Sequence, residues 1–505
     1  MKNRLLARAA LALLAGAAIT LIAVGSQAFA GPAQAKSNAN TAGRLGFAAP
    51  VYVSQVLSGG EPFVLQSTKF GSLVFSAHEG TTLLYRPGIE NSPGGDAQFL
   101  GNYRNQVGIW TSTDGGLNWT PVNWNNTLFF TNPLIDQGFS DPSMTQDAGG
   151  TIYDTGIDLA NDALFSSADG GFTWPTGTAD CHDGDRPWLA GGVPGEVFLA
   201  TDTVEGSGSG HEVFVSTDSG ATCSATGVAD NGTLADGTSY SGDGQLYYDR
   251  NDGSLVEPAV FTNPDGSTGL GISVAPNATQ TFANGTATFT PHEGVRSTTL
   301  FGHWPAIAID KANTIYLVWD TDNRAAGTSG GCSGSATPLA NSIMMTYTKD
   351  EGKTWSKPTV VAHPGTRVLW PWVAAGNGGN VSVVWWQYDS VVDPDCAPAT
   401  SNLYAYDANI SNATGAHPSM QTVNASGRPI HQGQICQEGT TCVASGQDRR
   451  LGDYFTNAID NSGCVQIATA DTMLTDPITG QPLPTARPLF IKQNSGLGLD
   501  GTACG

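Results

Sequence analysis

The chain has 505 residues and a formal net charge of −22, because 44 Asp and Glu residues outnumber 22 Lys and Arg residues. So acidic a surface disfavours nucleic acids and anionic membranes as partners. The 64 Gly and 28 Pro residues, with only 13% charged residues, are typical of an all-β protein with many turns.

The N-terminal segment has the pattern of a secretory signal peptide. Residues 1–8 are basic, residues 9–25 are almost wholly apolar, and Ala28-Phe-Ala30 is a small-x-small cleavage site. We therefore predict a signal peptide over 1–30, a disordered leader over 31–49 and a single folded domain over 50–505. No later stretch approaches the roughly 20 apolar residues that span a membrane. We expect a secreted, extracellular monomer.

The eight cysteines are even in number, as expected of disulfides in an exported chain. None has the Cys-x-x-Cys spacing of a zinc site. Other pairings stay open, but proximity in sequence favours Cys181–Cys223, Cys332–Cys396, Cys436–Cys442 and Cys464–Cys504.

The folded part is predicted to begin at the alternating segment Val51–Val56, followed by a first strand unit around Phe70–Phe75. A short motif, Ser/Thr-x-Asp-x-Gly-x-x-Trp, then recurs along the chain. Its Asp can accept hydrogen bonds from its own turn and its Gly allows a positive φ, so each copy predicts a hairpin between two strands. The copies are Ser112–Trp119, Ser167–Trp174, Ser216–Cys223, in which Cys replaces Trp, and Thr348–Trp355.

A second pattern aligns the apolar strands with almost no gaps. It begins at Asp141-Pro142, Arg186-Pro187, Trp304-Pro305 and Trp370-Pro371. With the first unit, a degenerate unit over 244–289 and a last unit from Gly452, the chain contains seven units. Four-stranded propeller blades repeat every ~40 to 50 residues, which suits this spacing.

The Ser/Thr-x-Asp-x-Gly-x-x-Trp copies resemble the Asp boxes (BNR repeats) of the sialidase (neuraminidase) superfamily. The resemblance implies a β-propeller of four-stranded blades, with the Asp boxes on outer turns away from the active site. We favour seven blades, and six, the number in true sialidases, is the alternative. Val51–Val56 is then the strand that closes the ring by pairing with the last blade.

Equivalent positions in successive blades face the same way, so residues just before each innermost strand should ring one mouth of the channel. This predicts a ligand site; the alternative is that Asp and Arg cap strands while Trp and Tyr fill the channel. The residues are Asp141, Asp185, Arg186, His303, Trp304, Leu369, Trp370, Gly452, Asp453 and Tyr454.

In the sialidase family three Arg side chains clamp a carboxylate, a Tyr paired with a Glu is the nucleophile, and an Asp is the acid/base. Carried over, the resemblance implies Arg186, Glu257, Tyr454 and Asp453 as catalytic residues, with Tyr388 as another possible nucleophile. Arg367, Arg449 and Arg450 are candidates to complete the clamp. The match is partial, because Arg186-Pro187 lacks the residue that separates Arg from Pro in the family, and no Arg lies some twenty residues after Glu257.

The sharpest function that the resemblance implies is an exo-α-sialidase-like glycoside hydrolase acting on terminal acidic sugars of glycans. One alternative is a non-catalytic propeller that binds glycan or protein through Trp304, Trp370 and Tyr454. Another is a polysaccharide lyase that uses a Tyr and His303 as base and acid. We predict no cofactor, with calcium as an option in the acidic, Gly-rich segment that contains Asp236, Asp243, Asp249 and Asp252.

Overall fold

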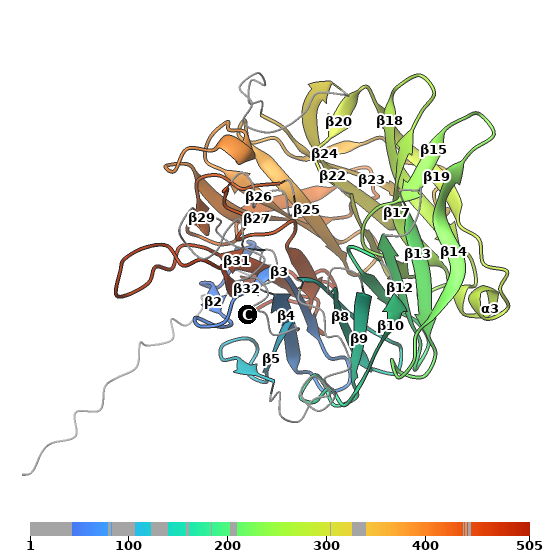
Figure 1. The fold of residues 1–505 in the computed structure, drawn as a ribbon. Coiled ribbons are helices and arrows are strands. Elements are labelled where there is room, and N and C mark those ends of the chain that lie inside the picture. The colour runs from blue at the N-terminus through green and yellow to red at the C-terminus, as the bar shows by residue number, and fades with distance from the viewer. Residues whose placement is uncertain are drawn as a thin grey trace, which may run out of the picture. The chain divides into compact units, whose positions relative to one another are not determined.

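The computed structural model describes residues 43–78, 82, 107–122, 140–157, 161–182, 184–202, 210–303, 305–325, 340–437, 439, 442 and 446–505. In this part of the chain the strands form seven antiparallel units, here called blades 1 to 7 (Figure 1). Each blade runs from an innermost strand outward in chain order, except that the outer edge of blade 7 comes from the N-terminal part of the described chain.

The first four blades follow one another directly. Blade 1 contains β3 (Gly60–Gln66), β4 (Leu73–His78), β5 (Gly108–Ser112) and β6 (Thr120–Pro121). Blade 2 contains β7 (Ser140–Gln146), β8 (Ile152–Ile157), β9 (Asn161–Ser167) and β10 (Thr176–His182). Blade 3 contains β11 (Trp188–Gly191), β12 (Val197–Asp202), β13 (His211–Ser216) and β14 (Ser224–Thr233). Blade 4 contains β15 (Ser239–Gly242), β16 (Tyr247–Tyr248), β17 (Leu255–Thr262), β18 (Thr268–Ala275) and β19 (Thr290–Ser297). Pairing of β14 with β15 joins blades 3 and 4.

Three further blades complete the ring. Blade 5 contains β20 (Thr299–Phe301), β21 (Ala306–Ile309), β22 (Ile315–Ala325), β23 (Ile343–Thr348) and β24 (Thr359–Ala362). Blade 6 contains β25 (Val368–Ala375), β26 (Val381–Tyr388), β27 (Asn402–Ser411), β28 (Ser419–Asn424) and β29 (His431–Gln432). Blade 7 contains β30 (Thr456–Ile459), β31 (Val465–Asp471) and β32 (Arg487–Ser495). Two short helices, α3 (Ala278–Ala283) and η2 (Pro394–Cys396), lie between strands.

The innermost strands contact one another in sequence around the ring. β3 contacts β7, β7 contacts β11, β11 contacts β16, β21 contacts β25, β25 contacts β30, and β30 returns to β3. Blades 4 and 5 meet through β17 and β21. Middle strands such as β8 and β26 are buried because neighbouring blades cover both faces, and β26 is mostly apolar, whereas the outer strand β28 is mostly exposed and polar. The predicted all-β propeller is confirmed, with seven blades.

The N-terminal part of the described chain completes blade 7. Val51 and Tyr52 of β2 (Val51–Tyr52) pair with Phe490 and Leu489 of β32. This confirms that Val51–Val56 helps to close the ring. A further strand, β1 (Gly46–Phe47), also pairs with β32, so the ordered chain begins earlier than the predicted leader over 31–49 allows. The predicted signal peptide lies outside the described residues.

The four repeated turns make nearly the same hydrogen bonds, and each lies between the last two strands of its blade, β5 and β6, β9 and β10, β13 and β14, or β23 and β24. In the first copy, Ser112 Oγ donates to Asp114 at 2.8 Å and accepts from the Gly116 N–H at 3.0 Å. Asp114 Oδ1 accepts from the Asn118 N–H at 3.0 Å. Gly116 has φ of 91°, and a Cβ there would lie 2.1 Å from the Phe490 ring of blade 7. The turn therefore requires glycine both for its backbone and for packing against the neighbouring blade.

A different Asp joins neighbouring blades at the same edge as these turns. Asp310, between β21 and β22, accepts from the Tyr316 hydroxyl and from the Gly379 N–H of blade 6, both at 2.8 Å. Asp147 of blade 2 does the same with Tyr153 at 3.0 Å and with Gly195 of blade 3 at 2.7 Å. Each carboxylate thus closes its own turn and holds the next blade.

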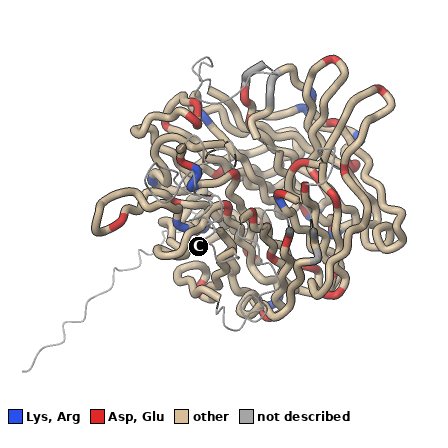
Figure 2. The backbone as a smooth tube through the Cα atoms, in the orientation of Figure 1, with Lys and Arg blue, Asp and Glu red and all other residues tan. Residues whose placement is uncertain are grey.

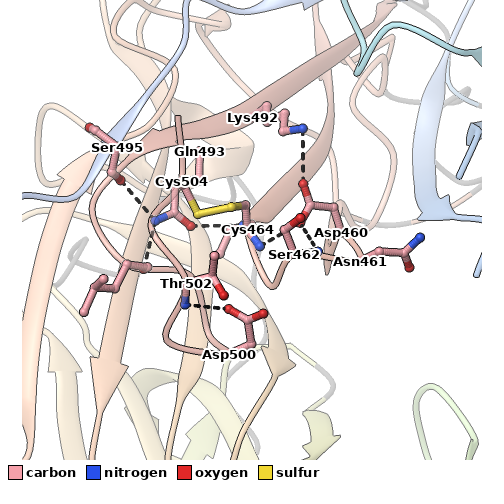
Figure 3. Close-up of a disulfide and its surroundings, with 12 residues drawn as sticks. Asp460, Asn461, Ser462, Cys464, Lys492, Gln493, Ser495, Asp500, Thr502 and Cys504 are labelled. Atoms are coloured by element: carbon pink, nitrogen blue, oxygen red, sulfur yellow. Dashed lines mark hydrogen bonds and ion pairs between the residues drawn. A yellow bond between two sulfur atoms is a disulfide. The ribbon is translucent and has the colours of Figure 1, made fainter. Parts of the chain in front are cut away.

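Three of the predicted disulfides are confirmed: Cys181–Cys223, Cys436–Cys442 and Cys464–Cys504. Figure 3 shows the last of these beside the turn in which Asp460 contacts Lys492 at 3.1 Å. Cys332 lies outside the described residues. Cys223 stands where the other repeats have Trp, so a covalent link to blade 2 replaces the ring at this turn.

Acidic residues, red in Figure 2, are scattered along the backbone and outnumber the basic residues, which are blue. Among the described residues, no helix is long and apolar enough to cross a membrane.

Candidate functional site

Four blades begin with a residue that precedes proline and has an unusual backbone conformation. Glu61, Asp141, Arg186 and Trp370 have φ angles of 48°, 51°, 56° and 48°. Non-Gly residues rarely adopt positive φ, and such strain persists only where the surroundings enforce it. The strand register shifts at three of these positions, in β3, β7 and β25, as in a β-bulge. The repeated bulge therefore places an unlike side chain from each blade at the same mouth of the channel.

Polar residues gather around this mouth, and we call this group the collar: Glu61, His78, Asp141, Asp185, Arg186, Asp202, Arg449 and Asp453. Glu61 links blades 1 and 7, since its two carboxylate oxygens lie 2.7 Å from the Asp453 backbone nitrogen and 2.6 Å from His78 Nε2. A carboxylate oxygen of Asp141 lies within 4.8 Å of both a Glu61 carboxylate oxygen and a His78 ring nitrogen. Burial and the charge of Glu61 raise the pKa of Asp141 to about 6.

Asp185 and Asp202 form the part of the collar that reaches solvent. The Asp202 N–H donates to the Asp185 carbonyl oxygen at 2.9 Å. The Asp185 side chain is exposed. Surrounding protein atoms and the charge of Asp141 raise the pKa of Asp185 to about 7.

The surroundings of Asp202 lower its pKa, in contrast to those of Asp185. Burial alone would raise the pKa of Asp202, but its contact with His211 and the charges of His211 and Arg186 lower it on balance. Arg186 Nη1 lies 3.7 Å from Asp202 Oδ2, and a third of the Arg186 side chain is exposed. Burial lowers the pKa of Arg186, but Asp453, Asp185 and other carboxylates more than offset this.

Arg449 and Asp453 form a bidentate ion pair on the blade 7 side, with N–O distances of 2.7 and 2.8 Å. Burial acts to raise the pKa of Asp453, but Arg449, Arg186 and His303 lower it. This carboxylate is therefore ionised, and its two oxygens are already bound by one guanidinium group.

The structure brings together four of the predicted site residues from three blades, Asp141, Asp185, Arg186 and Asp453, with Arg449 behind Asp453. Arg367 lies outside the collar in a buried pair with Asp322 at 3.5 Å, and Arg450 binds Asp448. Three separate carboxylates thus hold Arg367, Arg449 and Arg450, which leaves Arg186 as the collar arginine nearest to solvent.

The predicted tyrosines are buried, and their hydroxyl groups bind backbone carbonyl oxygens. Tyr454 is buried and donates to the Pro142 carbonyl oxygen at 2.7 Å. Its ring packs with Phe63, Trp188 and Trp372, so four aromatic rings fill the channel below the collar. The Tyr388 hydroxyl likewise donates to a backbone carbonyl, that of Gly433.

Two further predicted residues, His303 and Trp370, pack against each other with tilted rings at the blade 6 side. The His303 and Trp370 ring centroids are 4.6 Å apart, and Trp370 is buried. His303 Nδ1 lies 2.9 Å from Asp320, and Nε2 lies 2.9 Å from Gln437. Trp304 lies outside the described residues.

Glu257, which the resemblance paired with a tyrosine, pairs with a histidine in the structure. It is fully buried on β17 and contacts His211 Nδ1 rather than Tyr454. His211 in turn contacts Asp202, so Glu257 is connected to the collar indirectly.

Sequence reasoning missed Glu61, His78, Asp202 and His211. Glu61-Pro62 shares the residue-before-proline pattern of Asp141 and Arg186, so that pattern extended to blade 1 would have found it. Asp202 ends β12 in a Thr-Asp pair of the kind that closes several second strands. The two histidines have no local signal, because only strand pairing brings them to their partners.

The four acidic residues considered for calcium do not form one cluster. Asp236, Asp249 and Asp252 each accept from a backbone N–H of their own turn, and Asp243 lies near Arg186. Within the described ranges, the one group of three possible metal ligands is Glu61, His78 and Asp141.

A separate cavity of about 470 Å³ occupies the channel on the other side of the aromatic rings. It is lined by inner-strand residues and by residues of the β16 turn, among them Met144, Gln146, Tyr247, Arg250, Lys311 and Asn457.

No protein-family model matches the chain, and no curated protein matches it. Several solved structures have a similar fold. An ulvan lyase of polysaccharide lyase family PL25 aligns with a TM-score of 0.44 and 12% identity, over 85% of this chain and 92% of that chain.

Two further similar structures are glycoside hydrolases by their names. A mutant of the α-L-arabinofuranosidase Arb93A from Fusarium graminearum aligns with a TM-score of 0.41 and 13% identity, over 70% of this chain and 92% of that chain. The Hadza microbial sialidase Hz136 aligns with a TM-score of 0.38 and 14% identity, over 87% of this chain and 67% of that chain. These likenesses concern the fold alone.

Proposed function

We propose that the protein is a glycan-hydrolysing enzyme and that the collar is its active site, with Asp185 as proton donor and Asp202 as base. One observation carries the proposal: two neighbouring carboxylates at the mouth have pKa values shifted in opposite directions. Glycosidases need one protonated and one ionised carboxyl group at neutral pH, and such pairs are made by placing them in different environments.

The proposed reaction is general acid–base hydrolysis of a glycosidic bond. Asp185 gives its proton to the leaving oxygen as the bond from that oxygen to the anomeric carbon breaks. Water attacks that carbon, and Asp202 accepts the proton that water loses. Both products carry a hydroxyl group, and proton exchange with solvent restores the two carboxyl groups.

The charge of the collar favours a neutral sugar as substrate. Glu61, Asp141, Asp185, Asp202 and Asp453 outnumber the two arginines, Arg186 and Arg449, so an anionic ligand meets net repulsion even with Asp185 protonated. Neither of these arginines is without a carboxylate neighbour.

A second candidate is the narrower activity that the resemblance suggested, exo-hydrolysis of terminal acidic sugars. The observation that favours it is Arg186, whose guanidinium group is partly exposed at the mouth and whose Nη1 lies 3.7 Å from Asp202 Oδ2. A sugar carboxylate that displaced Asp202 would gain a bidentate partner. This candidate uses one arginine where the family pattern has three.

The test is release of reducing sugar by the purified protein from a panel of neutral polysaccharides, aryl glycosides and sialosides. We expect release from a neutral substrate, and loss of ~100-fold or more in kcat for Asp185→Asn and Asp202→Asn. Asp236→Asn is the matched control, because Asp236 is an exposed Asp with one turn hydrogen bond.

Other outcomes separate the remaining functions. Glycan binding without turnover would favour a non-catalytic propeller. Products that absorb in the ultraviolet would indicate a lyase. If both variants keep full activity on a substrate that the native protein cleaves, the carboxylate pair is not the catalytic pair.

A further inference from the structure

Behind Asp202 a row of ionisable side chains leads from the mouth into the protein. Asp202 at the end of β12, His211 at the start of β13 and Asp230 on β14 are directly paired across three adjacent strands of blade 3. Glu257 reaches the same place from β17 of blade 4. Strand register places the backbones of Asp202, His211 and Asp230 side by side.

His211 lies between two carboxylates. Its Nε2 is 3.1 Å from Asp202 Oδ1, and its Nδ1 contacts Glu257 Oε1. The exposed fractions of the side chains are 36% for Asp202, 1% for His211 and 0% for Glu257. Only the Asp202 end of this row reaches solvent.

The protonation of His211 follows from these contacts. A neutral imidazole carries one N–H, whereas an imidazolium carries two, so only the charged ring places an N–H both at Nδ1, which contacts Glu257, and at Nε2, 3.1 Å from Asp202. Without that positive charge, the fully buried Glu257 would have no cationic partner among the groups that contact it, which is costly. Burial disfavours the charged ring, but Glu257 and Asp202 more than compensate and raise the pKa of His211.

Resting on the proposed function, we propose that His211 and Glu257 are positioning residues that hold Asp202 ionised and aimed at the mouth. Glu257 keeps the His211 ring protonated and oriented. The charged ring in turn keeps the Asp202 carboxylate ionised and in position. No proton moves along the row. Glu257 therefore has a role in this site different from that of a partner to a tyrosine nucleophile.

Other charged groups face the same row. Asp230 lies beside Glu257, and the pKa of Asp230 is raised by burial and by that neighbouring charge. Asp243 lies near His211 and Arg186. Arg186 also favours the ionised form of Asp202, so loss of His211 should weaken the ionisation of Asp202 without removing it.

The first test reads the state of His211 directly and needs no substrate. In protein labelled with ¹⁵N in its histidine rings, the His211 signals are assigned by comparison with His211→Gln. We expect both ring nitrogens to be protonated at pH 7, where an ordinary histidine is mostly neutral. Glu257→Gln should lower the pH at which the ring loses its proton by one unit or more, whereas Asp407→Asn, a buried Asp of blade 6, should leave it unchanged. A neutral His211 ring at pH 7 in the native protein overturns the proposal.

The second test measures kcat/KM against pH on the substrate found for the native protein. We expect His211→Gln to lower kcat/KM about tenfold and to move the acid limb to higher pH by about one unit, because Asp202 loses a cationic neighbour. His431→Gln, another buried histidine, is the control for a merely structural loss; it should leave that limb in place. Glu257→Gln, which removes the charge, should move the limb in the same direction as His211→Gln, and Glu257→Asp, which keeps the charge, should preserve it.

The two tests separate failure of this inference from failure of the proposed function. Turnover with an acid limb that His211→Gln does not move overturns the positioning role alone. A protonated His211 ring in a protein that cleaves no glycan overturns the proposed function and with it the catalytic role of this row.

Discussion

The backbone N–H of Asp202 donates to the carbonyl oxygen of Asp185 at 2.9 Å, so the two carboxyl groups of blade 3 stay neighbours whatever their protonation. Their environments differ, because Asp185 faces Asp141 while Asp202 faces His211 and Arg186. At pH values between the lowered pKa of Asp202 and the raised pKa of Asp185, such a pair holds one proton, on Asp185.

The plot of activity against pH should therefore be bell-shaped. The rate falls above about pH 7, because Asp185 loses the proton that it must donate, and falls at low pH as Asp202 gains one. Asp185→Asn should remove the alkaline limb along with most of kcat. A profile of kcat/KM over pH 4–9 checks this, and an alkaline limb that persists in Asp185→Asn would assign the proton donor to another group.

Arg186→Ala separates the two candidate substrate classes. On a sialoside we expect loss of ~100-fold or more in kcat/KM, because the sugar carboxylate loses its guanidinium partner. On a neutral sugar we expect a smaller loss with an acid limb at higher pH, because Asp202 loses a neighbouring cation. Arg186→Lys is the matched control, since it keeps the charge but not the bidentate fork. Undiminished sialoside cleavage by Arg186→Ala would exclude Arg186 as the sugar-binding arginine.

Asp310→Asn should destabilise the ring by about 1–3 kcal/mol. Asp310 accepts four hydrogen bonds, two at each carboxylate oxygen. In the amide, an NH₂ group replaces one of these oxygens. That NH₂ group would face either two backbone N–H groups or the Tyr316 hydroxyl and the Gly379 N–H. Thermal unfolding checks the change, with Asp236→Asn as control. Equal midpoints for the two variants would mean that the link between blades 5 and 6 adds little.

Asp407 should make stability depend on pH. Burial raises its folded-state pKa from the ordinary 3.8 to about 7, so the folded protein binds the proton more tightly than the unfolded chain does. Stability then falls as pH rises from about 4 to about 7 and is flat above that. Asp407→Asn should remove this slope, with a gain relative to the native protein on the order of 2–4 kcal/mol between pH 4.5 and pH 8.

Urea unfolding of both proteins at the two pH values measures this difference. Asp236→Asn again controls for the loss of a surface charge. An identical pH dependence in the native protein and Asp407→Asn would show that Asp407 is ionised in the folded state.

The sequence predicted the blades and the mouth because both are local patterns. The turn at Ser112–Trp119 and the residue before proline at Asp141 and Arg186 carry their geometry in a few adjacent positions. The contacts between side chains could not be predicted as well from the sequence. Tyr454 was expected to face a ligand, yet it lies one residue beyond the collar, where strand alternation turns its ring into the channel. His211 and Glu257 are 46 positions apart and meet only through the packing of blades 3 and 4.

Blade 7 is assembled from both ends of the described chain, with β1 and β2 lying on β32 and the last disulfide beside them (Figure 1, Figure 3). During synthesis the early strands must therefore wait, unpaired, until β32 has been made. The ring cannot close until β32 has been made, because β1 and β2 pair with that strand. A chain stopped short of β32 would present an open sheet edge on blade 7, which makes interrupted synthesis a route to aggregation and the finished molecule resistant to unravelling from either end.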